Sequence, residues 1–300
     1  IDPEFPFCPI EIALGFPKDM EQMRSLKRAP SIYQFFPMRN ERHNMAYFIH
    51  GTSFSKITDR TRLDDQGEAN IETFKYIAKA LKRNLTKYKQ DNFDQFAIIY
   101  KALLFSDKSD EYDADLINNH LYSPMLEFVR TMIPTHKKNF YLKDLVVVKG
   151  TALNIDPMSL GIGKEWFLWN DYEKDGDIMR EATNNAKLGL RRWTVKELIL
   201  EGTPQLIDNW LENMTADEYA IFVSELKDVE FDSVFLEKFQ YIKTFRFSDN
   251  KGNVSFYSIK DLQNQQNVFL MSERTMPIRE EIKSLGFAVL EFNILDYSVI

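Results

Sequence analysis

Two arginines, Arg60 and Arg62, are the residues of this sequence best suited to contact an anion. They stand in a short polar segment between an apolar run at 45–49 and a longer amphipathic run that begins at Ile71. A guanidinium presents a planar fork of N–H donors that matches the oxygens of a phosphate or carboxylate. Loops held between rigid elements commonly carry binding residues. This placement predicts a phosphate contact; the alternative is a surface loop in which the arginines pair with nearby acids, namely Asp59, Asp64 and Asp65.

The elements that must position these arginines can be read from the apolar pattern on either side. Apolar runs predict strands at 10–16, 32–36 and 45–49, and the polar residues 39–44 between the last two favour an antiparallel hairpin. A helix is expected over 71–88, because apolar residues recur there every three or four positions. Its apolar stripe consists of Ile71, Phe74, Ala78, Leu81, Leu85 and Tyr88.

Another face of this predicted helix is basic. It carries Lys75, Lys79, Lys82, Arg83, Lys87 and Lys89, with no acid among them. Such a face can attract nucleic acid or an acidic partner, but more often it is simply solvated. Aromatic residues interleaved with the charges, as in single-strand binding proteins, are not visible in it.

The later sequence alternates helical and strand-like segments. Helices are expected at 93–104 and 116–132, and a strand or strand-to-turn element is expected at 141–148. Thr203-Pro204 and the capping box Thr215–Glu218 predict the starts of two helices. The turn sequence 249–253 lies between two apolar runs and predicts a hairpin. The chain then closes as a strand, a helix and a strand, expected at 268–271, 278–285 and 287–292.

These elements predict an α+β protein with a sheet-plus-long-helix module first. The polar segment 106–111 suggests the first boundary. The expected divisions are 1–5, which resembles translated cloning sequence, 6–105 for the first module, 106–202 for a mixed α+β region, and 203–300 for acidic helices, a hairpin and a β-α-β unit. Because the chain opens almost at once in a strand, we expect it to be a fragment of a longer protein.

Composition and charge narrow the possible functions. No apolar run approaches the length of a membrane span, and the single cysteine, Cys8, is compatible with a reducing compartment, so a cytoplasmic location is expected. The net charge of −7 is concentrated at 205–240, where nine acids face two lysines. The rest of the chain is nearly neutral, which argues against a general nucleic-acid footprint.

No other chemical motif is complete. Gly161-Ile162-Gly163-Lys164 resembles a phosphate loop, but Met158 and Glu165 occupy the places of its required Gly and Ser or Thr, so an ordinary turn is expected. The four histidines are too dispersed for a zinc site. No serine, cysteine or histidine signature of a nucleophilic enzyme is present.

The stretch from Tyr33 to Tyr88 resembles the start of the middle domain in sacsin-like and heat-shock-90-like (GHKL-type) ATPases. The similarity is carried by Phe36-Pro37, Ile49-His50-Gly51, Asp59-Arg60-Thr61-Arg62 and the helix from Ile71. In those families a middle-domain arginine reaches the γ-phosphate of ATP held by the preceding domain. The resemblance implies this role for Arg60, with Arg62 second. Asp64 stands where the heat-shock-90 pattern has Gln.

The same resemblance implies what this chain lacks. The Asp-x-Gly-x-Gly turn, the Mg-coordinating Asn and the Gly-rich lid of a GHKL nucleotide pocket are absent from the sequence. We therefore expect no cofactor in this fragment, and ATP and Mg²⁺ only with a missing upstream domain. The expected function is to couple ATP in that domain to binding of a protein client or partner by the later modules.

Two other classes of function remain open. The chain can be a non-catalytic interaction scaffold in which the acidic helices dock a protein partner. It can also be a nucleic-acid-binding module that uses the basic helix, although nucleic acid is the less favoured partner. Upstream sequence containing an Asp-x-Gly-x-Gly turn would favour the ATPase over the scaffold.

Overall fold

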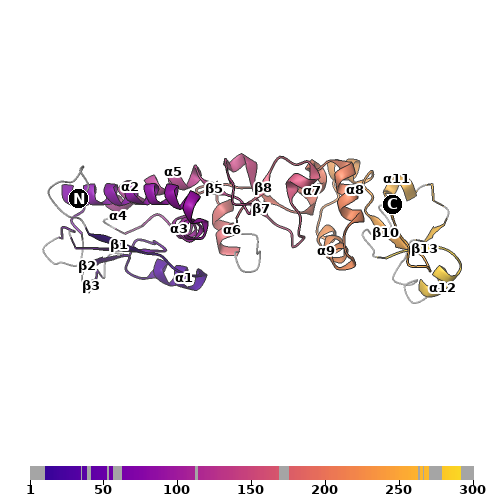
Figure 1. The fold of residues 1–300 in the computed structure, drawn as a ribbon, viewed down its shortest axis with the longest axis horizontal. Coiled ribbons are helices and arrows are strands. Elements are labelled where there is room, and N and C mark those ends of the chain that lie inside the picture. Colours follow the sequence, from indigo (N-terminus) through magenta and orange to yellow (C-terminus); the bar gives the residue numbers. More distant parts are fainter. Residues whose placement is uncertain are drawn as a thin grey trace. The chain divides into compact units, whose positions relative to one another are not determined.

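The computed structural model places the described residues in two compact units (Figure 1). Unit 1 takes its residues from 1–143 and 173–190, and unit 2 takes them from 144–172 and 191–300. The polar segment 106–111 lies within unit 1. The structure describes residues 11–34, 36–38, 42–52, 54–56, 63–111, 114–168, 176–262, 264–265, 267–269 and 279–291.

Unit 1 begins with a small mixed sheet and one helix. Strand order is β1-β4-β2-β3, and α1 (Met20–Arg28) connects the first two strands along the chain. The strands are β1 (Ile12–Gly15), β2 (Ile32–Gln34), β3 (Phe36–Pro37) and β4 (Phe48–Gly51).

The predicted antiparallel hairpin between the second and third apolar runs is wrong. β4 pairs with β2 in parallel, with Ile32 opposite Ile49, and it pairs with β1 antiparallel. The chain already reverses after β2, because Gln34 pairs with Phe36 in the short antiparallel strand β3. β4 therefore runs in the same direction as β2 and does not form a hairpin with it.

The rest of unit 1 is largely helical. The long helix α2 (Glu68–Asp91) buries Phe74, Ala78, Leu81 and Leu85 of the predicted apolar stripe, so the predicted helix and most of this stripe are confirmed. The helix expected at 116–132 is interrupted by a π-helical turn, η1 (Asn118–Tyr122). The remaining elements are α3 (Phe93–Phe105), α4 (Ala114–Ile117), α5 (Ser123–Arg130), β5 (Ile133–Pro134), β6 (Phe140–Tyr141) and α6 (Gly176–Thr183).

A buried lysine in the second stretch of unit 1, which comes from residues 173–190, joins this stretch to the first. Lys187 is 3% exposed, and its Nζ lies 2.6 Å from Glu181 and 2.7 Å from Asp107. The same Nζ donates to the carbonyl oxygens of Leu104 and Ser106, each at 2.8 Å. These carbonyls are at and beyond the C-terminal end of α3, so the ammonium group satisfies acceptors that the helix leaves open.

Unit 2 begins with a parallel three-stranded sheet in the order β8-β7-β9. Its elements are β7 (Val146–Lys149), the 3-10 turn η3 (Pro157–Leu160), β8 (Glu165–Trp166), β9 (Arg192–Trp193) and α7 (Val195–Glu201). A further 3-10 turn, η2 (Lys143–Leu145), precedes β7.

The acidic helices follow as α8 (Pro204–Glu212), α9 (Ala216–Lys227) and α10 (Ser233–Phe239). The capping box at Thr215 is formed with Glu218, as the sequence predicts.

The end of unit 2 is a mixed sheet in the order β11-β10-β13-β12. The predicted hairpin is confirmed: β10 (Phe245–Ser248) pairs antiparallel with β11 (Val254–Tyr257). Gly286 has φ +92° and ends α12 (Arg279–Ser284), as expected of a glycine after a helix. The remaining elements are α11 (Ile259–Leu262), β12 (Val268–Phe269) and β13 (Ala288–Leu290). Both units mix helices with small sheets, so the α+β class is confirmed.

The two sheets and the acidic helices of unit 2 share one hydrophobic core. Trp166, Trp193, Phe222 and Phe245 all lie in this core and are at most 1% exposed. Within the described ranges, no helix combines the length and apolar character needed to cross a lipid bilayer.

Candidate functional site

The segment that carries the two arginines is held at both of its ends in unit 1. Lys56 and Leu63 form an antiparallel β-bridge, and the Asp64 amide donates to the Ser55 carbonyl at 3.0 Å. Leu63 is 2% exposed, so its side chain anchors this junction in the core. Arg60 and Arg62, with the rest of residues 57–62, lie outside the described residues. The phosphate contact predicted for them therefore stays a prediction.

A buried asparagine in the first turn of α2 fixes this loop base. Asn70 is fully buried, and its Nδ2 donates to the carbonyl oxygens of Ser55 at 2.7 Å and Asp64 at 2.8 Å. Its Oδ1 accepts from the Ser55 amide at 2.9 Å. One side chain thus satisfies three backbone groups on the two strands of the loop base. The Asn70 side chain therefore ties both chain segments at the loop base to the long helix α2.

Sequence reasoning missed Asn70, although a signal was present. Asn70 precedes Phe74, Ile77, Leu81 and Leu85 on the buried stripe of α2. A polar residue on an apolar helix face must find partners when it is buried, because an unpaired amide is costly. Its partners lie in the loop just before the helix.

The glycine of the Ile49-His50-Gly51 motif has a packing role. Gly51 ends β4, and a Cβ at this position would lie 2.7 Å from the ring of Phe54. The Phe54 ring in turn stacks on Phe74 of α2, with centroids 5.6 Å apart and planes at 20°. Gly51 therefore lets the chain leave the sheet and pack directly against the helix that carries Asn70.

Acidic groups also lie at the loop base. The Asp64 carboxylate accepts from the Gln66 amide at 3.3 Å, and Asp65 accepts from the Gln66 side chain at the same distance. These contacts order the turn that leads into α2. The alternative in which the arginines pair with nearby acids involves residues 57–62, which lie outside the described residues.

Other chemical candidates from the sequence take structural positions. Gly161 has φ +76° and closes η3, and Lys164 donates to the Asp144 carbonyl at 2.5 Å, so the expected ordinary turn is confirmed. His43 is buried with its Nδ1 3.1 Å from Ser109 Oγ. Among the described residues, no group of His, Cys, Asp or Glu is arranged to hold a metal ion.

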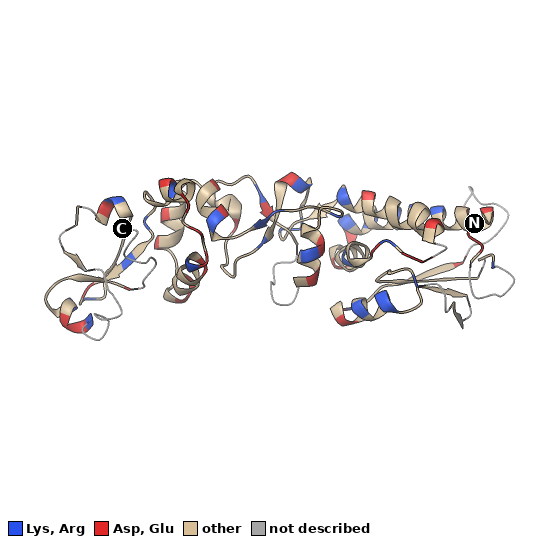
Figure 2. Cartoon of the chain, turned by 180° about the vertical axis from the view of Figure 1, so that it is seen from behind, with Lys and Arg blue, Asp and Glu red and all other residues tan. Residues whose placement is uncertain are grey.

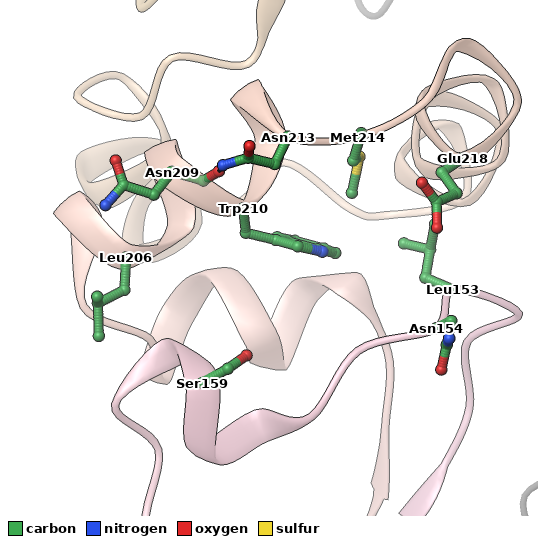
Figure 3. A pocket seen from close by; sticks show the side chains of 9 residues that line it. All are labelled: Leu153, Asn154, Ser159, Leu206, Asn209, Trp210, Asn213, Met214 and Glu218. Atoms are coloured by element: carbon green, nitrogen blue, oxygen red, sulfur yellow. Dashed lines mark hydrogen bonds between the residues drawn. The ribbon is translucent and has the colours of Figure 1, made fainter.

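A second candidate site is a hollow in unit 2 that sequence reasoning did not identify. It has a volume of about 320 Å³ and is formed by η3, α8, the start of α9 and the chain before η3. In Figure 3 the indole of Trp210 extends across the middle of the hollow, with Ser159 on one side and Met214 on the other. The full lining consists of Leu153, Asn154, Ser159, Leu206, Asn209, Trp210, Asn213, Met214 and Glu218.

Several polar groups of this hollow are already oriented by the fold. Asn213 donates to the Asn209 carbonyl at 2.7 Å, which leaves its Oδ1 as an acceptor. Hydrogen bonds from the Thr215 amide and hydroxyl lower the pKa of the Glu218 carboxyl, so this group is an anion at neutral pH. The Trp210 ring meets Phe222 edge-on at 5.9 Å, which supports the indole from behind.

The chemistry of this hollow suits binding rather than catalysis. Ser159 Oγ donates to the Asp156 carbonyl at 2.7 Å, and no histidine is present among the lining residues. The one carboxylate of the lining, Glu218, is a weak base because hydrogen bonds from Thr215 lower its pKa. The lining combines an indole, three amide side chains and apolar groups, with no cation. Such a surface accepts an apolar or aromatic group whose neighbours form hydrogen bonds with amides.

Comparison with known proteins found no relative of this chain. The chain matches no protein-family model, no curated protein and no solved structure.

Proposed function

We propose that unit 1 is the coupling module of a GHKL-type ATPase and that Arg60, with Arg62, contacts the phosphates of ATP held by a separate domain of the parent protein. The observation that carries this proposal is the set of three hydrogen bonds by which Asn70 holds the base of the arginine loop, here called the Asn70 clamp. The resemblance of residues 33–88 to sacsin-like and heat-shock-90-like middle domains supports it. ATP and Mg²⁺ belong to the other domain in this proposal, and this chain alone does not hydrolyse ATP.

The physical basis of the proposal is positioning. Phosphoryl transfer depends on cations placed against the oxygens that gain charge, and an arginine in this role contributes a factor of about 10³ to 10⁵ in other NTPases. That benefit requires a guanidinium held within a fraction of an ångström, which a mobile loop cannot provide. Asn70 fixes the two ends of the loop to α2, so Arg60 is the proposed catalytic residue and Asn70 the positioning residue.

The test is ATP turnover by the parent protein. Arg60→Ala is expected to lower kcat by about 10²-fold or more, because the missing cation acts mainly in the transition state. Asn70→Ala is expected to lower kcat while the Kd for ATP changes little. Arg83→Ala is the matched control, because Arg83 is exposed on α2. Turnover by the Arg60→Ala protein at the wild-type rate would exclude the proposed role.

One observation favours the interaction scaffold as a second candidate. The Trp210 hollow is built on α8 and α9, which carry Asp208, Glu212, Asp217, Glu218 and Glu225 against the single cation Lys227. A partner segment with an aromatic or proline side chain flanked by lysine or arginine complements both the indole and this negative charge.

The two candidates predict different outcomes. If the chain is a scaffold, Trp210→Ala weakens binding of peptides with a central aromatic residue and lysine flanks, whereas Arg60→Ala changes nothing that can be measured. Tyr241→Ala serves as the control, since Tyr241 is an exposed aromatic residue of unit 2 that does not line the hollow. Upstream sequence of the parent without an Asp-x-Gly-x-Gly turn would further favour the scaffold.

A further inference from the structure

Unit 1 contains a second hollow, on the basic face of α2. Its volume is about 420 Å³, and it lies where α2 faces the π-helical turn η1 and the start of α5. The lysines of this face are among the blue segments of α2 in Figure 2. The lining consists of Lys75, Ala78, Lys79, Lys82, Asn119, His120 and Pro124.

Cations from one helix and an imidazole from another element converge on this hollow. Lys75, Lys79 and Lys82 follow one another at spacings of four and three, which places them on one face of α2. His120 and Asn119 come from η1. No carboxylate is present among the lining residues, all of which are described. Lysines at this spacing repel one another, so an anion bound between them stabilises the helix.

The π-helical turn holds its side of the hollow in a fixed geometry. The Ser123 amide donates to the Asn118 carbonyl, the wide-turn bond of a π-helix. Asn118 is 2% exposed, and its amide exchanges two 2.9 Å hydrogen bonds with the Ser109 backbone. Single π-helical turns are rare and occur frequently at functional sites. Asn119 and His120 therefore project from a locked turn.

Two of these cations, Lys75 and Lys82, make contacts that leave donors for a ligand. Lys75 Nζ pairs with Glu72 at 2.7 Å, a surface contact that an anion can share, since an ammonium group has three donors. Lys82 Nζ lies over the Phe128 ring at 5.8 Å from its centroid, which neutralises none of its charge. Ala78 and Pro124 add a small apolar wall.

We propose that this hollow binds a compact phosphorylated small molecule, with its phosphates between Lys75, Lys79, Lys82 and His120 and its uncharged part against Ala78 and Pro124. The small volume favours a compact anion over a nucleic-acid strand, which needs an extended basic track. Lys89, farther along α2, lies over the Phe140 ring at 4.3 Å from its centroid and is not part of the lining. This inference is independent of the role proposed for Arg60.

The experiment is calorimetric titration of the whole chain with inorganic pyrophosphate and with tripolyphosphate at low ionic strength. Lys79→Gln combined with Lys82→Gln is expected to weaken binding by about 10-fold or more, because each lost ammonium removes a charge-assisted contact. Arg83→Gln combined with Lys87→Gln is the matched control, with the same change in charge on the same helix but outside the lining.

A second variant distinguishes binding inside the hollow from attraction by the general positive charge of α2. Asn119 is exposed, so Asn119→Trp is expected to fill the hollow and weaken pyrophosphate binding without changing the net charge or the fold. Thermal melts of each variant check the fold. No heat of binding, or equal loss in the control pair, would overturn the proposal. Tighter binding of a single-stranded oligonucleotide, with a steep salt dependence and sensitivity to the control pair, would also overturn it in favour of a nucleic-acid surface.

Discussion

Removing the Asn70 amide is the most direct test of the loop base. Asn70→Ala deletes three hydrogen bonds and leaves the Ser55 amide and the Ser55 and Asp64 carbonyls without this partner. Each intramolecular bond contributes about 0.5–1.5 kcal/mol net. Since the site is fully buried, we expect unit 1 to lose about 2–4 kcal/mol in free energy of unfolding.

The assay needs a global and a local readout. Urea unfolding followed by circular dichroism gives the free energy, and the m-value shows whether the unfolded or native state has changed. Hydrogen exchange of the Asp64 amide, which donates to Ser55, reports opening of the loop base itself. We expect this amide to exchange faster in the variant by a factor that matches the lost free energy.

The control is Asn84→Ala, the same substitution at an exposed position of the same helix. Alanine has the higher helix propensity, so this variant is expected to be unchanged or stabilised by about 0.5 kcal/mol. If Asn70→Ala unfolds within about 0.5 kcal/mol of the wild type and Asp64 keeps its protection, the clamp does not hold the loop.

Two further predictions concern the ion cluster of unit 1. Lys187→Met is expected to destabilise unit 1 by about 3–5 kcal/mol in urea unfolding, because it leaves Glu181 and two carbonyl oxygens buried without their donor; an unchanged midpoint would contradict this. Burial raises the pKa of Asp107, but bonds from Lys187 and Lys27 outweigh it and lower the pKa below its usual 3.8. A depressed pKa stabilises the fold above the unfolded-state value of about 3.9, and this contribution disappears as the pH falls through the lower folded-state value. Acid unfolding of Asp107→Asn should lack this part of the pH dependence, and identical acid profiles would count against it.

Local patterns predicted much of this fold. The Thr215 capping box, the hairpin around 249–253 and the helix end at Gly286 depend on a few neighbouring residues, and all three are confirmed. The pairing of β4 with β2 was not predictable in this way. A polar turn between two apolar runs is typical of an antiparallel hairpin, and the short β3 that reverses the chain early has no pattern of its own.

The candidate sites were harder to foresee, because their residues meet only in three dimensions. Asn70 obtains its partners from backbone groups of Ser55 and Asp64, which no side-chain pattern reveals. The Trp210 hollow joins segments near 154, 210 and 218. The basic hollow was visible only as lysines on one helix face, since the π-helical turn opposite them has no sequence signature. The phosphate contact of Arg60 and Arg62 stays a prediction.

The position of Lys187 in the sequence also determines when unit 1 can complete its folding during synthesis. The carbonyl of Leu104 receives its buried ammonium partner from a residue 83 positions later in the chain. Domains generally fold from the N-terminus during synthesis. Here the end of α3 stays open to solvent while the first part of unit 2 leaves the ribosome. Unit 1 is therefore expected to complete its folding only after residues 173–190 have emerged, so a ribosome stalled near residue 143 would display an incompletely folded intermediate.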